Sequence, residues 1–155
     1  MSNPTLFLMV GLPGSGKTTR AKQLEKTENA VRFTPDEWIT DLFEYDSGAD
    51  VDRIRESVEQ LQWSLAQELI DKGLNVVLDW GFWSKSERQK YREIAHRLGA
   101  TCKIDFSDLN VDELWLRSVD RKETQTVGFL HFTKNDLEKW IKIFEKPTSS
   151  ELELD

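Results

Sequence analysis

The segment "GLPGSGKTT", residues 11–19, places the strongest constraint on what this chain can fold into. Its pattern is Gly11-x-x-x-x-Gly16-Lys17-Thr18, and it lies between the apolar run "TLFLMV" and the helix-like run "KTTRAKQLEK". Glycines permit backbone angles that turn successive N–H groups toward one point, and a helix that begins there adds its positive end. The pattern therefore predicts a strand, a phosphate-binding loop and a helix in that order.

The residue types in this loop suit the phosphates of a nucleotide. Lys17 supplies a positive charge for the β- and γ-phosphates, and the hydroxyl of Thr18 is a ligand for Mg²⁺. We therefore expect ATP and Mg²⁺ as cofactors. The predicted nucleotide-binding residues are Gly11, Gly14, Ser15, Gly16, Lys17, Thr18 and Thr19.

Strand-like and helix-like segments alternate along the chain, which is typical of a parallel α/β sheet. The expected strands cover residues 5–10, 30–33, 75–81 and 101–106. The expected helices begin after Gly16, Thr34, Asp50, Ser84, Asn110 and Thr133. We expect Thr34 to cap its helix together with Glu37. The final residues "ELELD", 151–155, fit a fifth strand or a frayed tail.

The long helix expected over residues 50–72 has a clear apolar periodicity. Its apolar positions, at spacings of three and four, are Val51, Ile54, Val58, Leu61, Leu65 and Leu69. This spacing supports one long helix over the range.

Length, charge and cysteine content restrict the class of protein further. A chain of 155 residues has the size of one domain, and no apolar run is long enough to span a membrane. The start lacks a basic leader, and the single cysteine, Cys102, excludes a disulfide within the chain. We therefore expect one cytoplasmic domain over residues 1–155. A net charge of -7 argues against a broad basic surface for duplex nucleic acid.

Two aspartates follow the ends of predicted strands, where ligands bind in an open α/β sheet. Asp36 can accept a proton from a hydroxyl that attacks the γ-phosphate, or it is a solvated acid in the first turn of a helix. Asp79 ends the run "VVLD" and either holds Mg²⁺, fixes substrate, or is an ordinary strand-end acid. Trp80 follows it and either stacks on a substrate or packs in the core.

Two arginines, Arg117 and Arg121, lie four residues apart on one predicted helical face, just before the polar stretch "KETQTVG". Arginines at the base of a lid, here around residues 117–130, can offset charge on the transferring phosphate. The alternative is a solvated helix surface with nearby acids as partners. Arg88 and Arg92 form a weaker candidate pair on the helix after Asp79.

Sequence motifs also favour one class of nucleotide-binding protein. No glycine has an aspartate three residues before it, and there is no N-K-x-D pattern, so a GTPase switch is not expected. The segments "LMVGLPGSGKTTRAKQLE", "TPDEW", "NVVLDWGFWSKSER" and "ELWLRSVDRK" resemble the small AAA-type ATP-binding proteins grouped with the P-loop kinases. That group includes polynucleotide 5′-kinases, zeta toxins and chloramphenicol phosphotransferases.

The resemblance spans residues 5–122 and carries expectations of its own. It implies a three-layer α/β/α fold with parallel strand order 2-3-1-4-5, and Mg-ATP as phosphate donor. It implies that Asp36 is the general base and that Arg121, with Arg117, meets the transferring phosphate. It also implies that Asp79 lies near the metal or the substrate.

One departure from the family pattern bears on the acceptor. Polynucleotide kinases carry an arginine a few residues after the base, whereas "EWITDLF" here contains none, and the chain is acidic. Both features disfavour a nucleic-acid acceptor.

The leading hypothesis is an ATP-dependent kinase of a small hydroxylated molecule. Its expected catalytic residues are Lys17, Asp36, Arg117 and Arg121. Its expected substrate contacts are Asp36, Asp79 and Trp80, with Thr18 and Asp79 as metal ligands. The alternatives are a polynucleotide or nucleotide kinase and an ATP-binding regulatory module with slow hydrolysis. The acceptor and the oligomeric state stay open.

Overall fold

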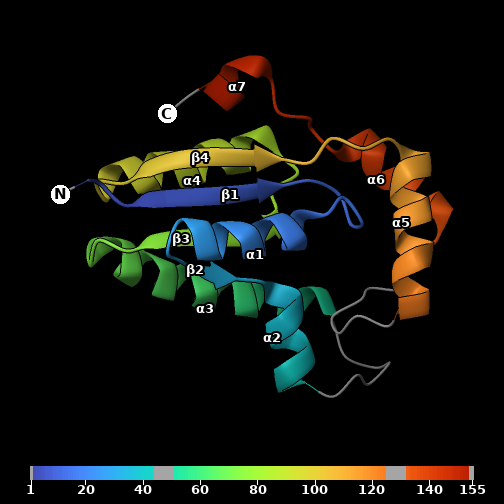
Figure 1. Cartoon of the computed structure of the whole chain (residues 1–155), viewed down its shortest axis with the longest axis horizontal. Helices are drawn as coiled ribbons and strands as arrows, with labels where there is room; N and C mark the ends of the chain where they lie inside the picture. Colours follow the sequence, from blue (N-terminus) through green and yellow to red (C-terminus); the bar gives the residue numbers. More distant parts are fainter. Residues whose placement is uncertain (1, 44–50, 125–131, 154–155) are drawn as a thin grey trace.

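A parallel sheet forms the centre of the computed structural model, which describes residues 2–43, 51–124 and 132–153 (Figure 1). Its four strands are β1 (Thr5–Val10), β2 (Ala30–Phe33), β3 (Asn75–Gly81) and β4 (Thr101–Phe106). They lie in the order β2-β3-β1-β4, and every neighbouring pair is parallel. The chain leaves β1 toward one side of the sheet and β3 toward the other. The carboxyl ends of these two strands therefore mark the crevice where such sheets bind ligands.

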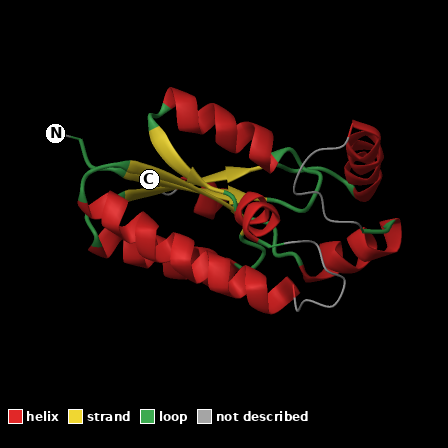
Figure 2. Ribbon diagram, turned by 90° about the horizontal axis from the view of Figure 1, so that it is seen from below, coloured by secondary structure: helices red, strands yellow, loops and turns green. Residues whose placement is uncertain are grey.

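Helices cover both faces of the sheet and complete three layers (Figure 2). The described helices of the whole chain are α1 (Lys17–Thr27), α2 (Pro35–Leu42), α3 (Val51–Asp71), α4 (Lys85–Arg97), α5 (Val111–Thr124), α6 (Lys134–Ile143) and α7 (Ser149–Glu153). Helix α1 packs on one face, and α3 and α4 pack on the other. Among the described helices, none combines the length and the apolar character that a membrane crossing requires.

Side chains of the central strand β1 alternate between two hydrophobic cores. Phe7 and Met9 pack with residues of α1, whereas Leu6 and Leu8 pack with residues of α3 and α4. Because both faces of β1 are buried beyond its first residue, the strand is apolar from Leu6 to Val10 instead of alternating with polar residues. The expected fold class is confirmed, with the strand order 2-3-1-4 for the strands described.

The C-terminal segment differs from the expectation of a fifth strand or a frayed tail. It forms helix α7 beside β4, and the described residues contain no fifth strand. The helix begins with a reciprocal cap. The N–H of Thr148 donates to Glu151 (3.1 Å), and the N–H of Glu151 donates to the Thr148 hydroxyl (3.2 Å). The pattern T-x-x-E was the sequence signal for this helix.

The expected cap of α2 is also different. Thr34 precedes the helix, but its side chain does not cap it. The Thr34 hydroxyl instead donates to Asp79 (3.0 Å), and Glu37 forms an ion pair with Arg32 (3.0 Å). A long-range partner on β3 has therefore replaced the local one.

Helices α5 and α6 pack against each other beyond the carboxyl ends of the strands (Figure 1). Leu12 of the phosphate loop joins Leu114 and Leu137 in a separate small core. The lid expected around residues 117–130 begins within α5. Its remainder, from residue 125 onward, lies outside the described residues.

Arg88 and Arg92 have structural partners, so their interpretation as a phosphate-binding pair is wrong. Arg88 is 1% exposed and donates to Glu151 (2.9 Å) and to the carbonyl of Phe82 (2.8 Å). Arg92 is buried and donates to the carbonyl of Cys102 (3.2 Å). The two guanidinium groups therefore connect α4 to α7 and β4.

We predict that Glu151→Ala lowers the free energy of unfolding by about 3–5 kcal/mol, because it leaves the buried Arg88 guanidinium without its counter-charge. Urea unfolding measures the change. Glu153→Ala removes an exposed carboxylate from the same helix and serves as the control, with an expected loss below about 0.5 kcal/mol. Equal losses in the two variants would contradict the structural role of the Arg88–Glu151 pair.

Candidate functional site

The loop between β1 and α1 depends on two glycines for its close turn. Gly16 has a φ of 88°, a left-handed conformation that strains any residue with a side chain. At Gly11, a Cβ atom would lie 2.6 Å from the Ser15 hydroxyl oxygen. Because Gly16 has no side chain to cap α1, the first N–H groups of that helix are left for a ligand at the loop.

Asp79, near the end of β3, joins two threonines at the base of the loop. Its Oδ2 accepts hydrogen bonds from the hydroxyls of Thr18 (2.7 Å) and Thr34 (3.0 Å). The residue is 6% exposed, and its Oδ1 has no hydrogen-bond partner among the described residues. A buried carboxylate oxygen without a partner, beside a threonine hydroxyl, fits Mg²⁺ or a water bound to it.

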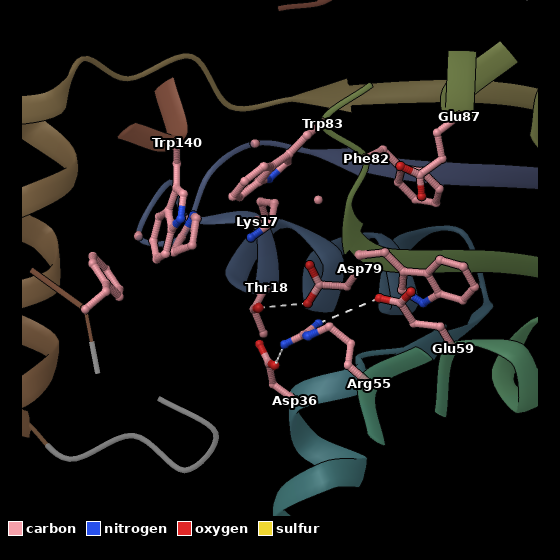
Figure 3. A pocket seen from close by; sticks show the side chains of 17 residues that line it. Lys17, Thr18, Asp36, Arg55, Glu59, Asp79, Phe82, Trp83, Glu87 and Trp140 are labelled. Carbon is pink, nitrogen blue, oxygen red and sulfur yellow. Dashed lines mark hydrogen bonds and ion pairs between the residues drawn. The ribbon is translucent and has the colours of Figure 1, made fainter. Parts of the chain in front are cut away.

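A cavity of about 430 Å³ lies next to Asp79 at the carboxyl ends of the strands (Figure 3). Its charged lining residues are Lys17, Asp36, Arg55, Glu59, Asp79 and Glu87. Its aromatic lining residues are Trp80, Phe82, Trp83, Phe132 and Trp140. The structure thus brings the predicted residues Lys17, Thr18, Asp36, Asp79 and Trp80 to one enclosure. Ser15 and Thr19 are not among the lining side chains, and their contact with a nucleotide stays a prediction.

Asp36 faces this cavity from the first turn of α2 and is 38% exposed. It forms an ion pair with Arg55 of α3, and the same guanidinium lies 3.7 Å from Glu59 (Figure 3). The sequence had indicated no arginine near Asp36. The structure supplies one from another helix.

The position of Arg55 follows from how α3 packs. Gln62 and Ala66 are buried, whereas Leu61 is 53% exposed and Leu65 is 37% exposed. Val58, one of the periodic apolar positions, is also buried, so the packed side of this helix coincides with the apolar stripe only in part. Arg55 lies on the side that faces the cavity, and no local signal in the sequence identified it.

Two carboxyl groups in the lining have unusual protonation behaviour. Burial raises the pKa of Glu59 to about 7 against the opposing effect of Arg55, and the nearby Glu87 and Asp36 raise it further. Burial also raises the pKa of Glu87, although neighbouring cations oppose the change. In both groups, the cost of burying a charged carboxylate outweighs the favourable effect of the nearby cations. Carboxyl groups perturbed in this way in a cleft are typical of functional sites.

Aromatic rings form much of the remaining wall. Trp80 stacks on Phe82, with 5.6 Å between ring centroids, and its indole N–H donates to Gln62 (3.1 Å). Trp80 therefore both lines the cavity and belongs to the core. Phe82 has a φ of 42°, a strained backbone conformation at the cavity wall. Trp83 and Trp140 form a second pair, with 5.8 Å between centroids.

The structure places one of the two predicted lid arginines at the phosphate loop. A Cβ atom built on Gly16 would lie 3.0 Å from Nη1 of Arg117, so this guanidinium reaches the loop from α5. The side chain of Arg121 lies outside the described part of the chain, and its role stays a prediction.

Comparison with known proteins identifies a family. The family model described as an AAA domain matches residues 6–147 of this chain. A search of the curated proteins found no match. A candidate kinase from Chloroflexus aurantiacus has a TM-score of 0.76 at 16% identity, over 95% of this chain and 83% of that one. A gluconokinase from Sinorhizobium meliloti 1021 has a TM-score of 0.65 at 20% identity, over 98% of this chain and 81% of that one.

A third similar structure belongs to an RNA repair assembly. A chain of the Pnkp1/Rnl/Hen1 RNA repair complex has a TM-score of 0.70 at 25% identity, over 92% of this chain and 44% of that one. This chain therefore spans less than half the length of that protein. Together the three structures show a shared P-loop kinase fold.

We predict that Glu59→Gln raises the free energy of unfolding at about pH 8 by about 1–3 kcal/mol. Burial raises the pKa of Glu59 to about 7 in the folded protein, from an ordinary value of 4.5 for a glutamate. The folded state binds more protons between these values, so the stability contributed by this group falls as pH rises through that window. The variant lacks this titration, and its advantage is expected to appear between about pH 5 and pH 8.

Urea unfolding at both ends of that pH range measures the effect. Glu68→Gln, at an exposed position of the same helix, is the matched control. The difference in free energy of unfolding between the Glu59 variant and the unsubstituted protein should grow with pH. If it does not, the raised pKa of Glu59 is wrong.

Proposed function

The chain belongs to the AAA domain family and has the α/β/α fold of P-loop kinases, and from this premise we propose that it is an ATP-dependent phosphotransferase acting on a hydroxyl group of a small molecule. One observation carries the proposal. The phosphate loop, the Thr18–Asp79 pair and Asp36 all face one cavity. A nucleotide, a metal ion and an acceptor can therefore each have a separate partner in the lining of one cavity.

The donor half of the reaction uses the phosphate loop. Backbone N–H groups at the start of α1 hold the β- and γ-phosphates, and Lys17 neutralises part of their charge. Thr18 and Asp79 are the residues that would hold Mg²⁺, which supplies further charge neutralisation at the phosphate oxygens when bound.

The acceptor half uses Asp36. Its carboxylate accepts the proton of the acceptor hydroxyl as that oxygen forms a bond to the γ-phosphorus. The bond from the γ-phosphorus to the bridging oxygen breaks, and ADP leaves with the electron pair. Arg55 orients the Asp36 carboxylate through their ion pair.

The lid arginines complete the proposed site. Arg117 lies beside Gly16, where a guanidinium group can offset charge on the phosphoryl group in transfer. Arg121 follows one helical turn later, and we propose that it contacts the same phosphate. We further propose that the chain is a single domain in which residues 117–130 act as a lid over the site.

A 5′-hydroxyl polynucleotide kinase is a second candidate, favoured by the 25% identity to the chain from the RNA repair complex. Incubation with labelled ATP separates the candidates. Label found in 5′-hydroxyl oligonucleotides supports the polynucleotide kinase, and label found in the small-molecule fraction of a cell extract supports the leading proposal. Release of labelled phosphate to water alone indicates a regulatory module with slow hydrolysis instead.

We predict that Lys17→Ala weakens binding of an ATP analogue by about tenfold or more, because the loop loses its charged contact to the phosphates. Isothermal titration calorimetry with AMPPNP measures the affinity. Lys26→Ala removes an exposed lysine from the last turn of the same helix and is expected to bind normally. Normal binding by the Lys17 variant would exclude its role in holding phosphate.

We predict that Asp36→Asn leaves AMPPNP binding intact but lowers phosphate transfer to the small-molecule fraction by about 10²-fold, because the proton acceptor is lost. Label transfer from ATP measures the rate. Asp41→Asn, at an exposed position of the same helix, is the control and is expected to transfer normally. Full transfer by the Asp36 variant would show that another group accepts the proton.

A further inference from the structure

We propose that the acceptor is an alcohol that also carries a protonated amine, and that Glu59 and Glu87 bind its ammonium group in the cavity beyond the phosphate loop. This inference rests on the proposed phosphotransferase function, because it specifies the class of molecule that receives the phosphate. It depends on charge, burial and the position of the groups that line the cavity.

The acceptor side of the cavity has an excess of carboxylates. The charged lining comprises the four acids Asp36, Glu59, Asp79 and Glu87 and the two cations Lys17 and Arg55. Lys17 and Asp79 belong to the nucleotide and its metal, and Arg55 forms ion pairs with both Asp36 and Glu59. On the acceptor side, the three carboxylates of Asp36, Glu59 and Glu87 therefore face one lining cation.

Contacts of the two glutamates support this assignment. Glu59 forms its ion pair with Arg55 at 3.7 Å, a distance longer than a direct hydrogen bond. Glu87 forms no direct ion pair within the part of the chain that is described, although the charges of Lys90 and Arg88 oppose the rise in its pKa. The two glutamates come from α3 and α4, and the charge of Glu87 contributes to the raised pKa of Glu59. A cation bound near both carboxylates would offset this repulsion.

The state of Asp79 shows that the same cavity is built to bind ligands. Asp79 lines it, is 6% exposed, and keeps one carboxylate oxygen without a hydrogen-bond partner among the described residues. A second metal ion is a poor occupant for the two glutamates. In the described ranges, no group of three or more His, Cys, Asp or Glu side chains could hold one. An ammonium group needs fewer ligands and suits paired carboxylates.

Aromatic surface beside the glutamates adds to the fit. Trp80 and Phe82 form a stacked pair in the same lining, and Glu59 and Glu87 lie on the same side of the cavity in Figure 3. Tryptophan faces attract cations, and they also pack against the C–H groups of a carbon skeleton. An anionic acceptor would instead face uncompensated carboxylates.

The connection through Arg55 limits the size of the acceptor. One guanidinium group contacts both Asp36 and Glu59, so a hydroxyl at Asp36 and an amine at Glu59 lie a few bonds apart. The predicted acceptor is therefore a compact amino alcohol or an amino sugar, with its amine near the phosphorylated hydroxyl.

Matched ligand pairs test the proposal. The protein saturated with AMPPNP and Mg²⁺ is titrated in a calorimeter with D-glucosamine and N-acetyl-D-glucosamine, then with serinol and glycerol. The members of each pair have similar shape, and only one carries an ammonium group. In at least one pair we expect the amine to bind about tenfold or more tightly than its neutral partner. If neither amine binds more tightly than its neutral partner, the inference is overturned.

Substitutions locate the effect. Glu59→Gln and Glu87→Gln are each expected to abolish the preference for the amine, while retained AMPPNP binding shows that the variants are folded. Glu56→Gln and Glu93→Gln, at exposed positions on the same two helices, are expected to keep the preference. A preference that survives in both the Glu59 and Glu87 variants would place the ammonium elsewhere and overturn the assignment.

Phosphate transfer to the same four compounds separates this inference from the proposed function. Transfer that favours the amines supports both. Equal transfer to the neutral partners supports the phosphotransferase and overturns the ammonium site. Binding that favours the amines, without transfer to any compound, supports the ammonium site and contradicts the phosphotransferase.

Discussion

The carboxylate of Asp79 connects the elements on which the rest of the site depends. It lies on β3, between the strands that carry the two halves of the site, and it accepts hydrogen bonds from Thr18 and Thr34. Thr18 belongs to the first turn after the phosphate loop, and Thr34 directly precedes the helix that carries Asp36. One buried side chain therefore sets the position of the phosphate loop relative to the candidate base.

The charged groups in the cavity beside this carboxylate differ from those buried elsewhere in the described structure. Elsewhere in the described structure, buried charges have close partners, as in the pair of Arg88 with Glu151. In the cavity, burial raises the pKa of both Glu59 and Glu87, and the nearby charges of Glu87 and Asp36 raise the pKa of Glu59 further. Burying carboxyl groups in this way lowers the stability of the protein when no ligand is bound. This cost is consistent with a binding site in which the ligand supplies a positive charge.

Most of the fold could be predicted from local signals, and the errors have identifiable causes. The strand bounds and the caps at Ser84 and Thr133 matched the sequence because each depends on neighbouring residues. Helix α7 was missed because the alternation in "ELELD" concealed the cap at Thr148. The cap at Thr34 failed because a hydrogen bond to a distant strand replaced the local one. In α3 the apolar period predicted the helix but not its packed side, where Gln62 is buried and Leu61 is exposed, because a helical period does not determine which of two adjacent stripes meets the sheet.

The sequence by itself determined the nucleotide half of the site. The phosphate loop is contiguous, and its glycines, lysine and threonine have only one suitable context, between a strand and a helix. The acceptor half was decided by tertiary structure. Asp36, Arg55, Glu59 and Glu87 come from three helices, and each is compatible with a solvated surface when viewed in sequence. They line one cavity, with raised pKa values at the two glutamates, only because those helices pack around one end of the sheet and partly bury the space between them.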